Sequence, residues 1–193
     1  MTKLIAPVVP AGTMARVRQP DVAIDDELKL RPWSSADVTA VLEAFSDQDI
    51  QHWHFRRFCS DSDALDWIAE CSSGWSAETS ATWAIATTEH DEAVGRVSLY
   101  TDLEHGHGEI TYWVLPHARG RHVATRACLA VTRWAHGLGL HRIRLQHSTA
   151  NHASRAVARR AGYTEEGVQR GATLHADGWH DMRLYSHLST DTR

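Results

Sequence analysis

The fold is decided by the stretch Val114-Leu115-Pro116-His117-Ala118-Arg119-Gly120-Arg121-His122-Val123-Ala124-Thr125. Apolar residues before it predict a strand that Pro116 ends, and the apolar spacing after it predicts a helix. The first turn of a helix has backbone N–H groups without an internal partner, and the helix dipole adds partial positive charge there. The junction is therefore suited to a pyrophosphate, and Arg119 and Arg121 add positive charge. A plain turn with two solvated arginines fits the same residues.

The patterns outward from this junction predict the remaining elements. Strands are predicted over residues 28–32, 82–86, 93–100, 108–115, 143–147, 163–169 and 182–188. Helices are predicted over residues 35–45, 50–58, 61–75, 122–137 and 151–160. The order β-α-α-α-β-β-β-α-β-α-β-β predicts a layered α/β (α+β-like) domain rather than the regular alternation of a doubly wound fold.

The two ends of the chain carry turn-forming residues. Residues 1–26 contain Pro7, Pro10, Gly12 and Pro20, which predicts an extended or loosely docked arm before the domain. Near the other end, Asp177-Gly178 is a turn-forming pair, and it predicts the tip of a final hairpin.

The composition excludes several classes of protein. The 193 residues suit one domain, and a formal net charge of -4 gives no general electrostatic reason to bind nucleic acid. No apolar run is long enough to span a membrane, and prolines interrupt the N-terminal residues, so we expect neither a membrane protein nor a secretory signal. Three cysteines without a Cys-x-x-Cys pair indicate a reducing compartment, and we expect a cytoplasmic protein.

Two motifs together resemble one known family. Arg119-Gly120-Arg121-His122-Val123-Ala124 resembles the acetyl-CoA signature of the GNAT superfamily, Gln/Arg-x-x-Gly-x-Gly/Ala. Asn151 to Tyr163, with the form Asn-x-x-Ser…Gly-Tyr, resembles the second CoA element of its RimJ/RimL branch. The resemblance implies a single acetyltransferase domain over residues 27–193, with a mixed, mostly antiparallel central sheet flanked by helices.

The same resemblance implies an N-acetyltransferase. Acetyl-CoA would donate the acetyl group to a primary amine, on a protein N-terminus or a small molecule, by direct transfer through a tetrahedral intermediate. No metal is implied, and a homodimer is the default expectation for the oligomeric state. The implied cofactor-binding residues are Val114, Leu115, Arg119, Gly120, Arg121, His122, Val123, Ala124, Thr125, Asn151 and Ser154.

Direct transfer needs a neutral amine, a donor to the oxyanion and a proton for the leaving thiolate. The family places a β-bulge in the strand before the loop, so the oxyanion donor would be a backbone N–H near Val114 or Leu115. Glu109 is the candidate base, acting through water; pairing with a surface cation is the alternative. Ser154 resembles the serine proposed to meet the CoA sulfur, and an ordinary small helix residue is the alternative. The tyrosine acid of many members is replaced by Ala158.

One position departs from the signature. Its central glycine, which lets backbone approach a phosphate, is His122 here. The side chain either points to solvent or contacts the pyrophosphate, and we favour the first option. The departure leaves open whether the donor is acetyl-CoA or another acyl-CoA. With Ala158 it also motivates a second hypothesis, a CoA-binding domain that has lost catalysis and has a sensing or regulatory role.

The 14 histidines raise a third hypothesis, a metal-binding protein. No cysteine pair or His-Glu-x-x-His motif accompanies them, and we expect surface histidines instead. His52-Trp53-His54 falls where early helices of the family border the acceptor groove, so His52, Trp53 and His54 are candidate substrate-binding residues. Helix packing explains the same three residues equally well.

Overall fold

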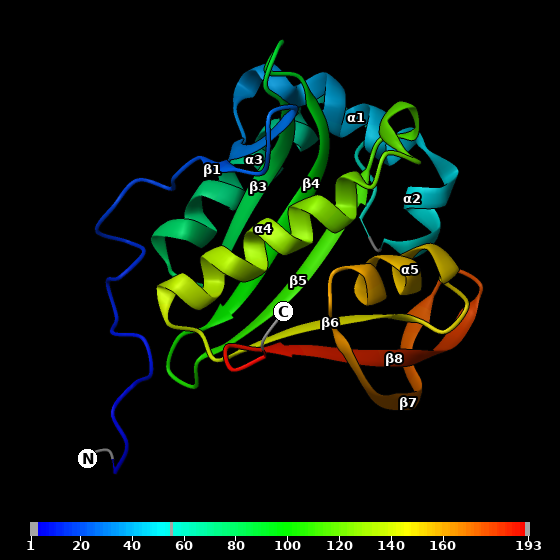
Figure 1. Ribbon diagram of the computed structural model, residues 1–193. Helices are drawn as coiled ribbons and strands as arrows, with labels where there is room; N and C mark the ends of the chain where they lie inside the picture. The colour runs from blue at the N-terminus through cyan, green and yellow to red at the C-terminus, as the bar shows by residue number, and fades with distance from the viewer. Residues whose placement is uncertain (1–3, 55, 192–193) are drawn as a thin grey trace.

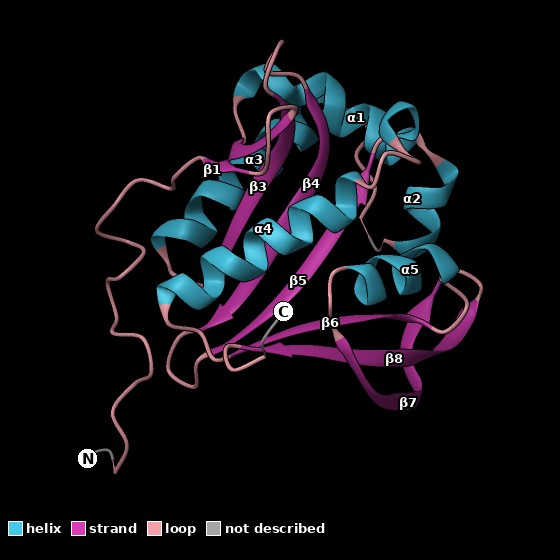
Figure 2. Cartoon of the chain, in the orientation of Figure 1, coloured by secondary structure: helices cyan, strands magenta, loops and turns pink. Residues whose placement is uncertain are grey.

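The computed structural model describes residues 4–54 and 56–191, which form an eight-stranded sheet with helices on both faces (Figures 1 and 2). The strands are β1 (Val22–Ala23), β2 (Leu28–Pro32), β3 (Ser80–Thr87), β4 (Ala93–Asp102), β5 (His107–Val114), β6 (Arg142–Ser148), β7 (Thr164–His175) and β8 (Gly178–Leu188). The helices are α1 (Val38–Ser46), α2 (Gln48–Trp53), α3 (Asp61–Ser76), α4 (Val123–Leu138) and α5 (His152–Arg160), with short 3-10 turns at Ser35–Asp37 and Pro116–Ala118. The predicted mixed α/β fold class is confirmed.

The sheet is antiparallel except at one place. Its strand order is β1-β2-β3-β4-β5-β6-β8-β7, and among these neighbours β5 and β6 alone run parallel. Their pairing covers His107 to Ile110 on β5 and Arg142 to Leu145 on β6. Beyond these pairs the strands diverge, so the sheet opens between them (Figure 1).

Each face of the sheet has its own apolar core. On one face α4 buries Ala127, Cys128 and Val131 with strand residues that include Val97 and Ile110. On the other face α1 and α3 form a second core, whose aromatic centre joins Trp33, Phe45, Trp67 and Trp113. Alternate residues of β5 therefore point into different cores, as the two-residue period of a strand requires.

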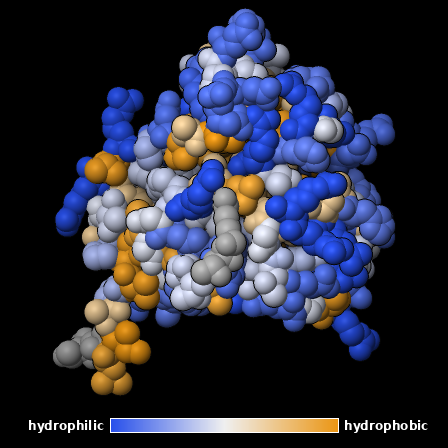
Figure 3. Space-filling model, in the orientation of Figure 1, coloured by the Kyte–Doolittle hydropathy of each residue, from blue (hydrophilic) through white to orange (hydrophobic). Residues whose placement is uncertain are grey.

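The N-terminal arm packs against the sheet. Val9 and Met14 are buried in the core beneath α4. The Glu78 carboxylate accepts backbone N–H bonds from Gly12 (2.6 Å), Met14 (2.6 Å) and Ala15 (3.1 Å). An ionised acceptor makes these bonds stronger than bonds between neutral groups. The arm is thus firmly docked over much of its length, whereas the Leu4 and Ile5 side chains are exposed. Figure 3 shows a group of apolar residues projecting from the body at the lower left. The division into an arm and a domain stays a prediction.

Two elements differ in extent from the sequence prediction. The helix predicted over residues 50–58 ends at Trp53, because His54 adopts an extended conformation. The last two strands are longer than predicted and meet at Asp177 and Gly178, so the final hairpin has its tip at the expected pair. No helix among the described residues is long and apolar enough to cross a membrane.

Candidate active site

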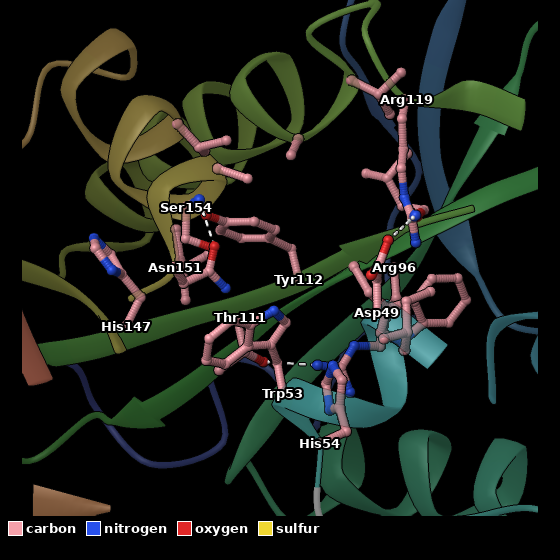
Figure 4. A pocket seen from close by; sticks show the side chains of 18 of the residues that line it. Asp49, Trp53, His54, Arg96, Thr111, Tyr112, Arg119, His147, Asn151 and Ser154 are labelled. Carbon is pink, nitrogen blue, oxygen red and sulfur yellow. Dashed lines mark hydrogen bonds and ion pairs between the residues drawn. The ribbon is translucent and has the colours of Figure 1, made fainter. Parts of the chain in front are cut away.

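A cavity of about 930 Å³ lies where β5 and β6 part. It is lined by Tyr112 and Val114 from one face of β5 and by Thr111 and Trp113 from the other. Because neighbouring strand residues point to opposite faces, the cavity reaches both sides of the sheet. Figure 4 shows Tyr112, Asn151, Ser154 and His147 on one side and Trp53, His54, Arg96 and Thr111 on the other.

The predicted phosphate junction forms one wall of this cavity. Val123, Ala124 and Thr125, the first turn of α4, line it together with Gly120 and His122. No side chain caps this helix end, so its first N–H groups have no capping partner. This uncapped helix end is a site at which the backbone can bind an anion.

His122 precedes α4 in a left-handed conformation, with φ 56° and ψ 21°. This is the conformation that glycine adopts most easily, and histidine is one of the few other residues found in it with some frequency. The backbone shape associated with the signature glycine is therefore retained. The His122 side chain is exposed at the cavity rim.

The two arginines of the junction have different surroundings. Arg119 donates to Asp47 (2.5 Å), to Asp49 (3.0 Å) and to the Val114 carbonyl (3.2 Å), so its charge is balanced by carboxylates of the α2 segment. Arg121 is exposed, lies outside the cavity lining and is 3.9 Å from the Glu27 carboxylate. The positive charge expected from Arg119 is thus used to hold the loop against α2.

The backbone of β5 presents an N–H group toward the opening near the end of the strand. Pairing of β5 with β4 runs without a register shift, so the expected bulge is absent from this ladder. The Leu115 N–H donates to the Val94 carbonyl (2.9 Å). Hydrogen-bonded and non-hydrogen-bonded pairs alternate along antiparallel strands, so the neighbouring Val114 N–H points away from β4, toward the opening. The oxyanion donor expected near Val114 or Leu115 is therefore available at Val114 and already used at Leu115.

The start of α5 supplies the opposite wall. Asn151 accepts the Ser154 N–H at 2.9 Å, which caps the helix as predicted, and both residues line the cavity. The phenol of Tyr112 lies beside Ser154 (Figure 4). Burial raises the pKa of Tyr112 above its ordinary value, and the Ser154 side chain acts in the opposite direction. Tyr112 was not selected from the sequence, although its position between Ile110 and Val114 on one strand face could have indicated it.

Glu109 does not line the cavity. Its carboxylate accepts a hydrogen bond from Gln146 (2.8 Å) and lies 3.2 Å from the Arg144 guanidinium. Gln146 does line the cavity, so Glu109 is one residue removed from it. Both interpretations of Glu109 therefore keep support. Arg144 is the surface cation of the structural interpretation, and Gln146 or water offers a proton route for the catalytic one.

The early helical segment lines the cavity on the α1 to α3 side of the sheet. Trp53 and His54 line the cavity, whereas His52 lies against the tip of the final hairpin, 3.7 Å from Asp177. Trp53 contacts His175 of that hairpin edge to face, with ring centroids 5.5 Å apart. Burial, followed by the charge of Arg96, lowers the pKa of His54 to about 4. Both interpretations of residues 52–54 therefore have support. Trp53 and His54 form part of the cavity wall, whereas His52 packs against the hairpin.

Two buried polar residues in the cavity were missed from the sequence. Arg96 on β4 is 7% exposed, and its Nη2 donates to Thr111 Oγ1 at 3.0 Å. His147 on β6 donates from Nδ1 to the Ser148 carbonyl at 2.8 Å, and its buried Nε2 has no hydrogen-bond partner in the described part of the chain. Burial lowers the pKa of His147. Neither residue belongs to a motif, so only their burial in three dimensions identifies them.

The clustered histidines do not assemble a metal centre in the described ranges 4–54 and 56–191, where no group of three or more His, Cys, Asp or Glu side chains is suited to hold an ion. His175 and His180 of the hairpin pack on each other, with ring centroids 4.7 Å apart. Their neighbours are aromatic rings and Asp177. The hairpin histidines are thus part of the packing between the hairpin and α2.

Comparison with known proteins agrees with this architecture. The family model "Acetyltransferase (GNAT) domain" matches residues 27–164. "Putative ribosomal N-acetyltransferase YdaF" of Bacillus subtilis (strain 168) is 34% identical over 100 residues, covering 50% of this chain and 54% of that protein. "Uncharacterized N-acetyltransferase YoaA" of the same organism is 24% identical and covers 83% of this chain and 93% of that protein. The chain thus spans about half the length of the first of these relatives.

Solved structures share the fold at lower identity. RimL, a ribosomal-protein alpha-N-acetyltransferase in complex with coenzyme A, superposes with a TM-score of 0.81 at 20% identity, covering 89% of this chain and 100% of that one. The microcin C7 self-immunity acetyltransferase MccE, in complex with acetyl-CoA and AMP, gives 0.78 at 21% identity, covering 86% and 94%.

The mixed sheet is the fold that this chain shares with these acetyltransferase structures. The chain belongs to the GNAT family of acetyltransferases. Its relatives agree with the RimJ/RimL-like branch expected from the sequence. Acetyl-CoA is the acyl donor of this family and acts as a substrate.

Proposed function

We propose that this chain transfers the acetyl group of acetyl-CoA directly to a primary amine, through a tetrahedral intermediate and without an acyl-enzyme. The observation that carries the proposal is the cavity that passes between β5 and β6 and reaches both faces of the sheet. Such a passage lets the donor enter from the α4 and α5 side and the amine from the α1 to α3 side, so that they meet at β5. Proximity of this kind contributes a large part of the rate in bimolecular transfers.

The donor half has the features that a pyrophosphate needs. The uncapped N–H groups of Val123, Ala124 and Thr125 would hold the phosphates, with Gly120 giving close backbone approach. Gly120 has φ +78° and open space around its Cα. The exposed Arg160 at the cavity edge adds positive charge in place of Arg119. Asn151 and His122 would border the bound donor.

The reacting centre lies beside β5. We assign the oxyanion contact to the Val114 N–H, because Leu115 is already bonded to β4. The leaving sulfur would lie near Ser154 and Tyr112, whose hydroxyl groups can stabilise or protonate a thiolate. Ser154 and Tyr112 would together replace the tyrosine acid that many family members carry at the position of Ala158. Ala158 itself is fully buried here.

The proton of the amine has two routes. Glu109 can accept it through Gln146 or water, or Glu109 can hold Gln146 in place while solvent accepts the proton. We favour the second role, because the Glu109 carboxylate is held by Arg144 and lies outside the cavity lining. Trp53 and His54 would form the wall that the acceptor contacts, with His52 fixing that wall to the hairpin.

The acceptor is a protein N-terminus or a small amine. YdaF and RimL are named for ribosomal proteins, which supports including protein N-termini among the candidates. A catalytically impaired CoA-binding domain is the second candidate, favoured by Ala158 and His122. The cytoplasmic location, the homodimer and the absence of nucleic acid and membrane partners stay predictions.

An acceptor screen tests the proposal. Purified protein is incubated with acetyl-CoA and a panel of peptides and small amines, and thiol release is followed together with mass spectrometry of the acceptors. We expect N-acetylated product that depends on the protein and is lost when Val123 and Ala124 are replaced by proline residues. Tight acetyl-CoA binding without product for any amine would instead support the impaired domain.

A further inference from the structure

Among residues 4–54 and 56–191, Arg96 is a buried cation without a counter-ion. It lies in the middle of β4 and is 7% exposed, and its guanidinium lines the acceptor half of the cavity beside His54 (Figure 4). Its Nη2 donates a hydrogen bond to Thr111 Oγ1. Nε is buried without a hydrogen-bond partner among residues 4–54 and 56–191.

Burial of an unpaired charge is unfavourable, and proteins almost always balance it with an opposite charge. Desolvation lowers the pKa of Arg96, but an arginine keeps its proton under ordinary conditions. The other nearby arginines have partners, since Arg56 binds Glu70 and Arg119 binds Asp47. Arg96 thus differs from Arg56 and Arg119, each of which has an acidic partner.

Neighbouring titratable groups do not supply the missing negative charge. Glu70 is held by Arg56, and burial raises the pKa of the Cys71 thiol to about 12, which keeps it neutral. His54 is neutral at ordinary pH because burial lowers its pKa. Among the described residues, the acceptor half of the cavity therefore holds one unbalanced positive charge, at Arg96. The lining of this half includes the side chains of Trp53, Trp67 and Trp113.

We propose that Arg96 binds a carboxylate carried by the acceptor, so that the preferred substrates are amines that also bear a single negative charge. A guanidinium fork matches a planar carboxylate, and Thr111 holds the fork in place from one side. One positive charge is balanced by one carboxylate, whereas a phosphate would leave excess negative charge in a largely aromatic site. This inference rests on the proposed acetyl transfer and narrows its acceptor.

The carboxylate has two sources that share this chemistry. It is either the α-carboxylate of a free amino acid or a side-chain carboxylate next to the N-terminus of a peptide. Matched acceptors separate them: amino acids against their amides, compared at equal concentration of free amine, and amidated peptides beginning Ser-Glu against peptides beginning Ser-Gln. A third pair, O-phosphoethanolamine against ethanolamine, tests whether a phosphate is preferred instead of a carboxylate.

The variants are Arg96→Gln, which removes the charge, and Arg96→Lys, which keeps it but loses the fork. Arg133→Gln is the matched control, because Arg133 is exposed on α4 and lies outside the cavity. We expect the wild-type protein to favour the carboxylate member of at least one pair by at least about tenfold in kcat/KM. Arg96→Gln should lose this preference, Arg96→Lys should keep part of it, and the Arg133→Gln control should keep all of it.

A binding measurement separates this inference from the proposed function. Two matched pairs that cannot be acetylated at nitrogen are titrated into each protein without acetyl-CoA: N-acetylalanine against N-acetylalaninamide, and N-acetylglutamic acid α-amide against N-acetylglutamine α-amide. Tighter binding of the carboxylate to wild type but not to Arg96→Gln would support the inference even if no amine were turned over. Equal binding and equal turnover of both pair members, a preference for the phosphate acceptor, or a uniform loss of activity toward every acceptor in Arg96→Gln would each overturn it. Unchanged acetyl-CoA binding and melting temperature show that the variants fold.

Discussion

Arg119 Nη1 donates to Asp49 Oδ2 over 3.0 Å, which ties the loop after β5 to α2 on the opposite side of the cavity. The same guanidinium binds Asp47, which caps α2 through the Ile50 N–H. Burial acts to raise the pKa of Asp47, but Arg119 and the backbone N–H groups of Ile50 and Asp49 together outweigh it, so the pKa is lowered. A residue of the signature loop thus holds α2 in position beside the cavity.

The first prediction concerns this contact. Arg119→Gln should raise the KM for the acceptor several-fold, because α2 loses its link to the loop, and should change acetyl-CoA affinity by less than about threefold. Steady-state kinetics with each substrate varied in turn measures both effects. A large loss of acetyl-CoA affinity that weakens at high salt would show that Arg119 contacts a phosphate instead.

The second prediction concerns His122. Because its backbone is left-handed, glycine should fit at least as well, and His122→Gly should preserve or slightly improve acetyl-CoA binding with little dependence on pH. His122→Val should lower the melting temperature, since a β-branched residue is strained there by about 1–2 kcal/mol. Calorimetric titration of CoA at pH 6 and pH 8 is the measurement. A large loss in the glycine variant that is greater at pH 6 would identify His122 as a phosphate ligand.

The third prediction concerns the sulfur end of the cavity. Ser154→Ala and Tyr112→Phe should each lower kcat by about tenfold to a hundredfold without unfolding the protein. If the two hydroxyl groups act on one sulfur, the double variant should lose little more than either single variant. Single-turnover kinetics of all four proteins gives the coupling. Independent, multiplicative losses would mean that the two residues serve different atoms.

The fourth prediction concerns Glu109. If its role is to hold Gln146, Glu109→Gln should lower kcat by a few-fold at every pH, and Gln146→Ala should produce the same loss. Acetylation rates across pH 6 to pH 9 with one amine measure this. A loss confined to low pH, where free amine is scarce, would instead assign the proton acceptor to Glu109.

The fifth prediction concerns stability in acid. The folded state keeps His54 neutral with a pKa of about 4, below its ordinary value of 6.5. The unfolded chain therefore binds more protons between these values, and stability is full above pH 6.5 and falls as the pH drops toward 4. The shift contributes up to about 2–3 kcal/mol. Thermal melts of wild type and His54→Leu in this range should show a flatter pH dependence in the variant; parallel curves would contradict the assignment.

Sequence patterns were sufficient for most of the secondary-structure elements and for one wall of the cavity. Pro116, Gly139 and the Asp177-Gly178 pair mark local chain reversals, and local signals of this kind place strands and helices closely. The junction at Gly120 to Thr125 and the cap at Asn151 were found because both depend on neighbours in sequence. Both lie on the wall that the donor would use.

The acceptor half could not be predicted in the same way. Arg96 lies in a strand whose neighbours Val94 and Val97 are buried, and nothing local shows that it lacks a counter-ion. The link from Arg119 to Asp47 joins residues far apart in the chain, so the sequence indicated a phosphate contact where the structure has an ion pair. Long-range charge pairing is decided by the packing of elements and not by their periodicity.

The limited pairing between β5 and β6 has a consequence for how acceptor range can change. The two parts of the sheet are joined at one end, by His107 to Ile110 on β5, and are apart at the other. A small change of the angle between β5 and β6 at the joined end becomes a larger displacement at the open end, where the cavity lies. A side chain at Gly108 would press against Leu99 and Ile143 at that joined end. Substitutions there, distant from the reacting atoms, should therefore alter how wide the passage opens and which amines can enter it.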